Sequence, residues 1–217
     1  MKATINLYNA DCLPAMRKMA DNQYSLALVD PPYGIDFVSK GQIGNSKFTP
    51  KEWDKKIPDN KYFIELKRIS KNQIIWGANY FKFLFPNRSF IYWNKLNHDN
   101  KGDGELATTS FDIGNRYFEY MWDGNRYGTY NNIKGVGKPT IRIHPTEKPI
   151  DLYKFCLKNY AKENDTILDT HFGSLSIGIA CHDYGYSLDA YEIDRDYFEA
   201  GKKRLNTHKS QLQINYE

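Results

Sequence analysis

A short apolar run that ends in two prolines sets strict limits on how this chain can fold. Leu26 to Val29 lead directly into the pentapeptide Asp30-Pro31-Pro32-Tyr33-Gly34. Four apolar residues bounded by a carboxylate and two prolines predict a buried strand that delivers a rigid loop to the carboxyl edge of a sheet. Open α/β sheets bind their ligands at that edge, so the loop is predicted to form the active site.

The residues of this loop suit one chemical task, the placement of an exocyclic amino group of a flat heterocycle. The Asp30 carboxylate and a backbone carbonyl held by Pro31 and Pro32 can accept the two N–H bonds of the amine, which favours a more localised lone pair on its nitrogen. Tyr33 offers a stacking face for a base taken out of its helix. The alternative is an ordinary Asp-Pro-Pro turn that leaves a strand, with Tyr33 packed on a local core.

The length of the chain predicts a single domain, and its cysteines are expected to be reduced thiols. The 217 residues suffice for a single domain with a substantial core. The start of the chain lacks the apolar region of a signal peptide, and no apolar stretch is long enough to span a membrane. Cys12, Cys156 and Cys181 are widely spaced and form no Cys-x-x-Cys pair. A cytoplasmic protein without zinc and without membrane contact is therefore expected.

Basic residues are concentrated in the middle of the chain. Residues 38–148 contain 19 Lys and Arg against 11 Asp and Glu, a net charge of +8, whereas the remaining residues carry −4 and the whole chain +4. With its many aromatic side chains, such a region is typical of a surface for a polyanion and its bases. A solvated, lysine-rich surface is the alternative.

The stretch before the central strand predicts a strand, a turn and a helix. Ile5 to Tyr8 has strand character, and residues 13–19 carry apolar side chains at helical spacing. Asp11 lies in the turn between them, on the same sheet edge as Asp30. It is expected either to accept a hydrogen bond from an adenine amino group or to cap the following helix.

The middle of the chain alternates predicted elements with loops. A helix over about 59–70 precedes strands at 73–76 and 90–93, the aromatic segment 79–86 is predicted to be helical, and residues 116–122 alternate like a strand. Residues 36–56 have no clear period and residues 124–143 are rich in Gly, Asn and Lys, so both are predicted loops. Gly102 and Gly104 mark a flexible tip.

A strand–turn–helix–strand unit near the C-terminus predicts a nucleoside site. After a helix over 148–161, residues 166–168 form a strand, 169–174 a Gly-containing turn, 177–184 a helix and 188–191 a strand that ends at Glu192. Asp169 and Glu192 are 23 residues apart. A tight turn that opens a helix, with an acidic residue about twenty positions later, seats a nucleoside with its ribose hydroxyls on the carboxylate. An ordinary βαβ unit is the alternative, because Gly-x-Gly-x-x-Gly is absent.

Five motifs follow one another along the chain. They are the Ala-Asp-Cys-Leu opening at 10–13, Asp30 to Tyr33, the hexapeptide His144 to Pro149, Leu168-Asp169 with Phe172-Gly173-Ser174, and Tyr191 to Asp194. In this order they resemble the β-group of amino-methyltransferases that act on DNA with S-adenosylmethionine. The match covers about residues 5–37 and 142–205. The Asp-Pro-Pro-Tyr motif precedes the cofactor turn, which is the order typical of this group.

The resemblance implies a circularly permuted Rossmann-like class I methyltransferase fold of the α/β class, with a mostly parallel seven-stranded sheet and helices on both faces. A single domain over residues 1–217 is expected, with target-recognition insertions at about 38–56 and 94–141. The implied catalytic residues are Asp30, Pro31, Pro32 and Tyr33. The implied cofactor site places Thr146 and Lys148 at the methionine end, Glu192 at the ribose and Asp11 with Cys12 at the adenine, and it is completed by Asp30, Ile193, Asp169, Thr170, His171, Phe172, Gly173 and Ser174. His171 is expected to be part of the turn or of the cofactor wall rather than a base.

The implied function is the transfer of a methyl group to N6 of an adenine flipped out of DNA, as in restriction–modification systems, without a metal. Homodimers are common in the family and are therefore expected. Within this family Asp at the first motif position is commoner for adenine and Ser for the N4 of cytosine, so Asp30 favours adenine. Cytosine-N4 is the alternative target. A further alternative is a non-catalytic DNA-binding relative. The turn at residues 169–177 lacks the Pro and the second Gly of the family pattern Asp-Pro-Phe-x-Gly-Ser-Gly-Thr-Thr, and Leu175 adds a side chain where the backbone approaches the ligand or a neighbouring strand.

Overall fold

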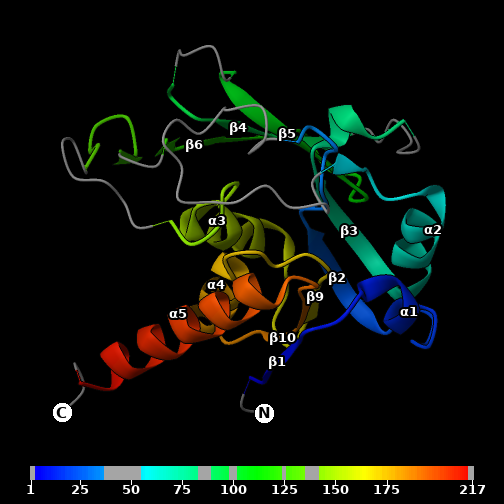
Figure 1. The fold of residues 1–217 in the computed structure, drawn as a ribbon. Coiled ribbons are helices and arrows are strands. Elements are labelled where there is room, and N and C mark those ends of the chain that lie inside the picture. The colour runs from blue at the N-terminus through cyan, green and yellow to red at the C-terminus, as the bar shows by residue number, and fades with distance from the viewer. Residues whose placement is uncertain are drawn as a thin grey trace.

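The computed structural model describes residues 3–36, 55–82, 89–97, 102–123, 126–134 and 142–214. Its centre is an eight-stranded sheet in the order β1-β10-β9-β2-β3-β5-β4-β6 (Figure 1). The strands are β1 (Ile5–Tyr8), β2 (Tyr24–Val29), β3 (Ser70–Trp76), β4 (Ser89–Asn94), β5 (Gly104–Thr109), β6 (Arg116–Glu119), β9 (Thr166–Asp169) and β10 (Ser187–Tyr191). Within this sheet β5 is antiparallel to both of its neighbours, and all other pairs are parallel.

Helices cover both faces of the sheet, as Figure 1 shows. α1 (Cys12–Met16) and α2 (Asn60–Ile69) pack on one face, and α3 (Ile150–Tyr160), α4 (Ser176–Tyr184) and α5 (Arg195–Ile214) pack on the other. The central strand β2 serves both layers, because Leu26 and Leu28 join the core under α3 and α4 while Ala27 and Val29 join the core under α2. Because β2 is buried on both faces, its side chains are apolar in both directions, which explains the continuous apolar run in the sequence.

The sheet confirms the predicted fold class but has one strand more than expected. The additional strand is β5, whose sequence Gly-Glu-Leu-Ala-Thr-Thr has too few apolar residues to stand out, and Gly104 begins this strand instead of marking a flexible tip. The predicted strand 116–122 is divided at Tyr120. β6 pairs with β4, whereas β7 (Met121–Trp122) forms a separate hairpin with β8 (Tyr127–Gly128), which lies within the predicted loop 124–143.

The predicted helix 79–86 and the two expected insertions are described only in part. Only a 3-10 turn, η2 (Ala78–Tyr80), occupies the start of the predicted helix 79–86, and residues 83–88 lie outside the described part of the chain. Of the expected insertion at 38–56 only residues 55 and 56 are described. The second expected insertion, 94–141, includes β5 and β6, so part of it completes the main sheet. Among the described residues, no helix is long and apolar enough to cross a membrane.

Candidate active site

The candidate active site lies where β9 and β2 are neighbours in the sheet. From β9 the chain continues through α4 to β10, whereas from β2 it continues through α2 to β3 on the other side, and these two helices pack on opposite faces. The loops after the two strands therefore diverge and leave a crevice at the carboxyl edge. Asp30 directly follows β2, and Thr170 directly follows β9.

A cavity of about 670 Å³ occupies this edge of the sheet. Small-molecule and cofactor sites typically have volumes of about 300–1,000 Å³. The predicted site residues that line the cavity are Asp30, Pro31, Pro32, Tyr33, Thr146, Lys148, His171, Phe172, Gly173, Ser174, Glu192 and Ile193. The other four predicted residues, Asp11, Cys12, Asp169 and Thr170, are outside its lining.

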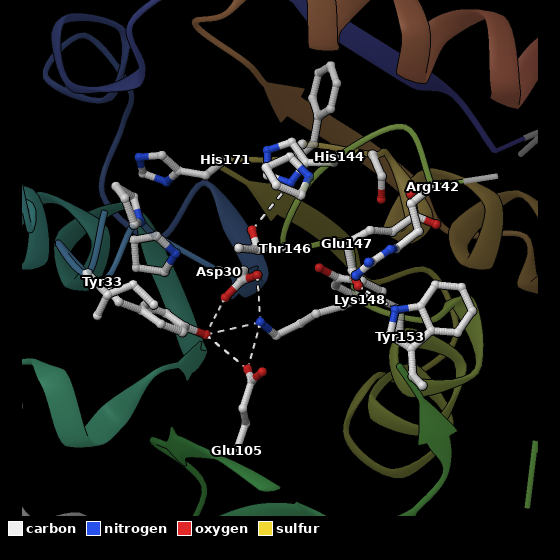
Figure 2. A pocket seen from close by; sticks show the side chains of 18 of the residues that line it. Asp30, Tyr33, Glu105, Arg142, His144, Thr146, Glu147, Lys148, Tyr153 and His171 are labelled. Carbon is white, nitrogen blue, oxygen red and sulfur yellow. Dashed lines mark hydrogen bonds and ion pairs between the residues drawn. The ribbon is translucent and has the colours of Figure 1, made fainter. Parts of the chain in front are cut away.

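The Asp30 carboxylate is the centre of a polar cluster in this cavity (Figure 2). Its Oδ1 accepts a hydrogen bond from Tyr33 Oη at 2.6 Å, and its Oδ2 accepts one from Lys148 Nζ at 2.7 Å. Lys148 Nζ also lies 2.9 Å from Glu105 Oε2 and 3.0 Å from Tyr33 Oη, so each of its three N–H bonds has an acceptor. Burial raises the pKa of Asp30, and the Lys148 ammonium opposes that rise.

Glu105 is the member of this cluster that sequence reasoning missed. It is the second residue of β5, and because β5 runs against β3 and β4, its first residues reach the carboxyl edge of those strands. Lys95 follows β4, and its Nζ lies 2.5 Å from Glu105 Oε1. Burial acts to raise the pKa of Glu105, but Lys148 and Lys95 outweigh burial and hold that pKa well below its usual range. The signal in the sequence, a glutamate at the start of a weakly apolar stretch, gains meaning only when the strand direction is known.

Packing also holds the Tyr33 ring in place. The ring stacks on Tyr80, with centroids 4.8 Å apart and planes 10° apart. Gly77 approaches the same ring so closely that a Cβ there would lie 2.2 Å from a ring carbon. The predicted stacking face of Tyr33 thus already has an aromatic neighbour, and a base that stacks on that side must displace Tyr80, which is 42% exposed.

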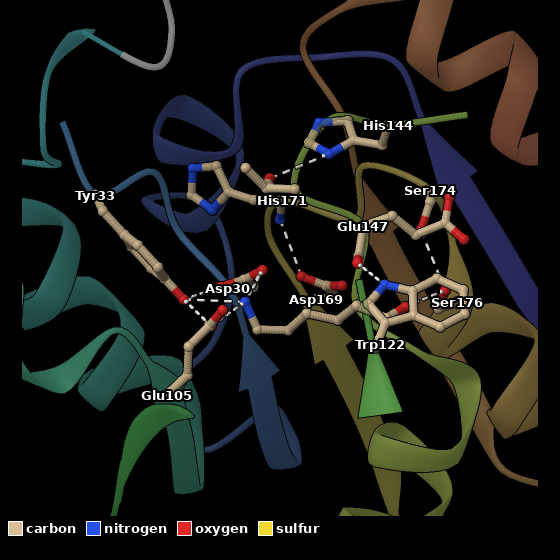
Figure 3. Close-up of polar contacts among 12 residues, drawn as sticks. Asp30, Tyr33, Glu105, Trp122, His144, Glu147, Asp169, His171, Ser174 and Ser176 are labelled. Atoms are coloured by element: carbon tan, nitrogen blue, oxygen red, sulfur yellow. Dashed lines mark hydrogen bonds and ion pairs between the residues drawn. The ribbon is translucent and has the colours of Figure 1, made fainter. Parts of the chain in front are cut away.

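The turn after β9 is anchored beneath the cavity by Asp169 and Thr170. Asp169 is fully buried, and its Oδ1 accepts from the His171 amide at 3.0 Å, whereas its Oδ2 has no hydrogen-bond partner in the described part of the chain (Figure 3). Burial raises the pKa of Asp169 to about 8. Thr170 Oγ1 shares a hydrogen bond of 2.6 Å with Tyr62 Oη on α2. These two residues therefore shape the turn without lining the cavity.

His171 presents a neutral ring to the cavity. Burial lowers the pKa of its imidazole to about 4. The ring packs edge-on against Tyr62 at 5.4 Å, and Nδ1 lies 2.9 Å from Thr170 Oγ1. This environment suits a wall of the site.

Glu192 closes the turn from the side of β10. Its Oε2 accepts from the Gly173 amide at 2.9 Å, and its Oε1 accepts from the Asp194 amide at 2.8 Å. The residue is 7% exposed, and burial raises the pKa of its carboxyl group to about 7. Each carboxylate oxygen has capacity for a second hydrogen bond, so Glu192 can also accept from a pair of hydroxyls.

The turn and Glu192 together fit a nucleoside cofactor. Gly173 has a positive φ of +50°, and a Cβ there would lie 3.3 Å from the His144 ring, so a glycine keeps this part of the cavity open. Phe172, Gly173 and Glu192 line the same cavity as Asp30. The cofactor turn and the Asp30 loop therefore face one continuous space.

Cofactor binding at Glu192 is expected to weaken by about tenfold between about pH 8 and pH 6, because the carboxylate accepts hydroxyl hydrogen bonds well only when it is ionised. Its pKa of about 7, raised by burial, places the loss of charge in this range as the pH falls. Isothermal titration calorimetry with S-adenosylmethionine measures the change. The Glu192→Gln variant is the control and should show no such pH dependence. A wild-type Kd that stays constant over this range would remove Glu192 from the cofactor contacts.

Leu175, in the place of the family's second glycine, points into the core. It adopts a left-handed backbone with φ +57°, its side chain is fully buried, and it does not line the cavity. Gly178 on α4 and Gly201 on α5 leave room for it, since Cβ atoms there would approach Leu175 carbons to 2.7 and 3.0 Å. The side chain expected to crowd the ligand is therefore accommodated between two helices.

Replacement of Leu175 is expected to affect stability rather than cofactor binding. Leu175→Ala should lower the free energy of unfolding by about 2–4 kcal/mol, as for other buried leucines, and leave the Kd for S-adenosylmethionine within about twofold. Leu175→Gly is the matched variant, because it also relieves the left-handed backbone, which costs a leucine about 1–2 kcal/mol. Urea unfolding and calorimetry measure the two quantities. Cofactor binding that becomes tenfold tighter in either variant would mean that Leu175 does obstruct the site.

The hexapeptide His144 to Pro149 is anchored so that Lys148 reaches Asp30. The His144 ring packs on Tyr197 at 4.4 Å, Thr146 Oγ1 lies 3.3 Å from His144 Nδ1, and burial together with the nearby Lys148 lowers the pKa of His144 to about 3. Glu147 pairs with Arg204 of α5 at 3.1 Å, and its carbonyl accepts from Trp122 Nε1 at 2.6 Å (Figure 3). In this structure the Lys148 ammonium contacts Asp30 and Glu105, and not the turn at residues 169–174.

Asp11 and Cys12 lie beside the cofactor turn. Asp11 caps α1, since its side chain accepts from the Leu13 amide at 3.0 Å, which is one of its two expected roles. Cys12 is buried, with Sγ 4.0 Å from His171 Nε2, and burial raises the pKa of its thiol to about 12. Their predicted contact with adenine stays a prediction.

Comparison with known proteins shows which family this chain is similar to. The family model for N6/N4 DNA methylases matches residues 90–203. The Type II methyltransferase M2.LlaDCHI from Lactococcus lactis subsp. cremoris is 25% identical over 248 residues, which cover 92% of this chain and 88% of that protein. M.HpaI from Haemophilus parainfluenzae is 22% identical over 235 residues, covering 91% of this chain and 73% of that one.

Solved structures share the fold at lower identity. The crystal structure of the M1.HpyAVI–SAM complex superposes with a TM-score of 0.60 and 18% identity over 93% of this chain and all of that chain. PvuII DNA methyltransferase, which is cytosine-N4-specific, superposes with a TM-score of 0.58 and 13% identity over 97% of this chain and 93% of that one. The family model covers more than half of the sequence and includes both the hexapeptide and the cofactor turn. The chain therefore belongs to the N6/N4 DNA methylases and is a DNA amino-methyltransferase.

Proposed function

We propose that this chain transfers the methyl group of S-adenosylmethionine to the N6 amino group of an adenine flipped out of DNA. The observation that carries the proposal is the shared cavity, in which the Asp30 carboxylate and the Tyr33 ring face the same space as Gly173 and Glu192. One site can thus hold a nucleoside cofactor and an amine acceptor side by side. The proposed catalytic residues are Asp30, Pro31, Pro32 and Tyr33.

The protein's part in this reaction is to position the target amine against the methyl group and to exclude water from the site. S-adenosylmethionine supplies a methyl group that its sulfonium already activates, so the reaction asks for no metal. Asp30 accepts one N–H of the target amine and the Pro31 carbonyl accepts the other, which leaves the nitrogen lone pair free to form the new N–C bond. Trp93, Trp122 and Tyr153 line the cavity with aromatic surface that limits the access of water. As the new N–C bond forms, the bond between the methyl carbon and the sulfonium sulfur breaks, and the neutral thioether is released. The methylated nitrogen, which now carries the positive charge, then loses one proton to solvent and becomes neutral.

Asp30 favours adenine over cytosine, because Asp at this motif position is commoner in adenine enzymes of the family. The fold itself does not discriminate, since PvuII DNA methyltransferase, a cytosine-N4 enzyme, shares it. The test is to incubate the protein with unmethylated DNA and S-adenosylmethionine in EDTA, digest the DNA to nucleosides and identify the product by mass spectrometry. N6-methyladenine supports the proposal, and N4-methylcytosine replaces it with the alternative.

The non-catalytic alternative loses its main support in this structure. That alternative rested on the extra side chain of Leu175, which is buried in the core instead of facing the ligand. Calorimetry with S-adenosylmethionine still separates the two cases. A protein that gives no heat at high micromolar cofactor would be a binding module.

DNA contacts are proposed for the parts of the chain between β4 and the hexapeptide. The described basic residues there are Lys95, Arg116, Arg126, Lys134 and Arg142, and Tyr117 and Tyr130 are 55% and 71% exposed. Cations that contact phosphates and rings that stack on bases are the usual means of binding DNA. The stretches at 38–56 and 94–141 remain the proposed target-recognition segments. The proposed homodimer can be tested by analytical ultracentrifugation.

A further inference from the structure

The Lys148 ammonium occupies the hydrogen-bonding position that a target amino group requires. Its Nζ donates to Asp30 Oδ2 at 2.7 Å, and the side chain is 4% exposed (Figure 2). An exocyclic amine must donate to the same carboxylate to be aligned for methylation. Without DNA, Lys148 Nζ therefore makes the hydrogen bond to Asp30 that the N–H of the target amine would make.

A second carboxylate shares this ammonium. Glu105 Oε2 lies 2.9 Å from Lys148 Nζ, only slightly farther than Asp30 Oδ2. Lys95 balances the charge of Glu105 from the other side at 2.5 Å, so the four ionised groups Asp30, Glu105, Lys148 and Lys95 have no net charge. Lys148 can leave Asp30 without becoming an unpaired buried charge, which would be strongly unfavourable.

We propose that Glu105 is a positioning residue that holds Lys148 when the target amine binds, so that the amine replaces Lys148 on Asp30 Oδ2. The inference rests on the proposed methyl transfer and deepens it. Glu105 acts through Lys148 and does not touch the reacting atoms. Tyr33 Oη donates to the other oxygen, Asp30 Oδ1, at 2.6 Å, so it can keep the carboxylate oriented while Oδ2 exchanges its donor.

Four variants test this role of Glu105 by their rates of methyl transfer: two single variants, their double variant and a control. In Glu105→Gln the ammonium loses its second anion and stays on Asp30, so kcat should fall by about tenfold or more while the Kd for S-adenosylmethionine stays within about twofold. In Lys148→Met two neighbouring carboxylates lose their shared cation, which should also lower kcat. The double variant removes the competing ammonium together with its second anion, and it should be faster than either single variant. Glu163→Gln removes one exposed carboxylate just before β9, at the opposite end of that strand from the cavity, and should match the wild type.

Single-turnover rates of these variants, measured on whichever DNA base the wild type methylates, decide the matter. A double variant no faster than Glu105→Gln or no faster than Lys148→Met would mean that Glu105 or Lys148 contacts the substrate directly. A wild-type single-turnover rate in Glu105→Gln would mean that Glu105 has no part in positioning. Either result overturns the inference.

Thermal melting gives a second measurement that does not depend on catalysis. If the two side chains are partners, the double variant should lose less Tm than the sum of the single variants. Additive losses in an enzyme whose wild type is active would overturn the inference and leave the proposed function intact. A wild type that methylates no DNA base would instead refute the proposed function, and the inference with it.

Discussion

Asp30→Ala is expected to reduce the rate of methyl transfer by about 10²–10³-fold, which is the usual scale for the loss of one preorganised electrostatic partner. The Kd for S-adenosylmethionine should stay nearly unchanged. The carboxylate lies at the end of β2 in the cavity, where it can accept from the target amine, whereas Glu192 and the turn residues 171–174 supply the proposed cofactor contacts. Single-turnover kinetics at saturating cofactor measure the chemical step, and calorimetry measures binding.

The structure also predicts that Asp30→Ala stays folded. Lys148 loses one anion but keeps Glu105 at 2.9 Å, and Tyr33 Oη still lies 3.3 Å from Glu105 Oε2. The melting temperature without ligand should therefore remain close to that of the wild type. Asp30→Asn is the matched variant, because it preserves shape and removes only the charge. If Asp30→Ala unfolds the protein or retains full activity, the loop is structural and the catalytic assignment fails.

Replacement of Glu192 is expected to have the opposite effect, on binding instead of chemistry. Glu192→Ala should weaken the binding of S-adenosylmethionine by about 1.5–3 kcal/mol, or roughly 10–150-fold in Kd, as expected for lost hydrogen bonds to a charged acceptor. Activity should partly return at saturating cofactor, since the Asp30 loop is unchanged. The measurement is kcat and KM for the cofactor, together with calorimetric Kd.

Glu192→Gln separates the cofactor contact from the support that Glu192 gives to the turn. The Glu192 carboxylate accepts from the amides of Gly173 and Asp194, so the alanine variant also loses two backbone partners and should melt at a lower temperature. Glutamine keeps one acceptor oxygen and should melt closer to the wild type while still binding the cofactor weakly. A glutamine variant with wild-type Kd would show that the charge of Glu192 does not hold the ribose.

The local parts of this site follow from the sequence alone. The run Leu26 to Val29 before two prolines predicts a buried strand with a rigid loop after it, and β2 confirms the strand. The spacing from Asp169 to Glu192 likewise predicts the unit β9–turn–α4–β10, because strand, turn and helix signals there lie within a few residues of one another. Both segments needed only short-range information.

Tertiary structure decided how these parts meet. Lys148 and Asp30 are 118 residues apart, and their contact depends on the anchoring of the hexapeptide to α5 and β7. Leu175 reads as an obstruction in the sequence, but Gly178 and Gly201 give it space in the core. Glu105 reaches the site because β5 runs antiparallel between β3 and β4. The two-residue period of a strand is the same in either direction, so only pairing with distant strands determines which end of β5 faces the cavity.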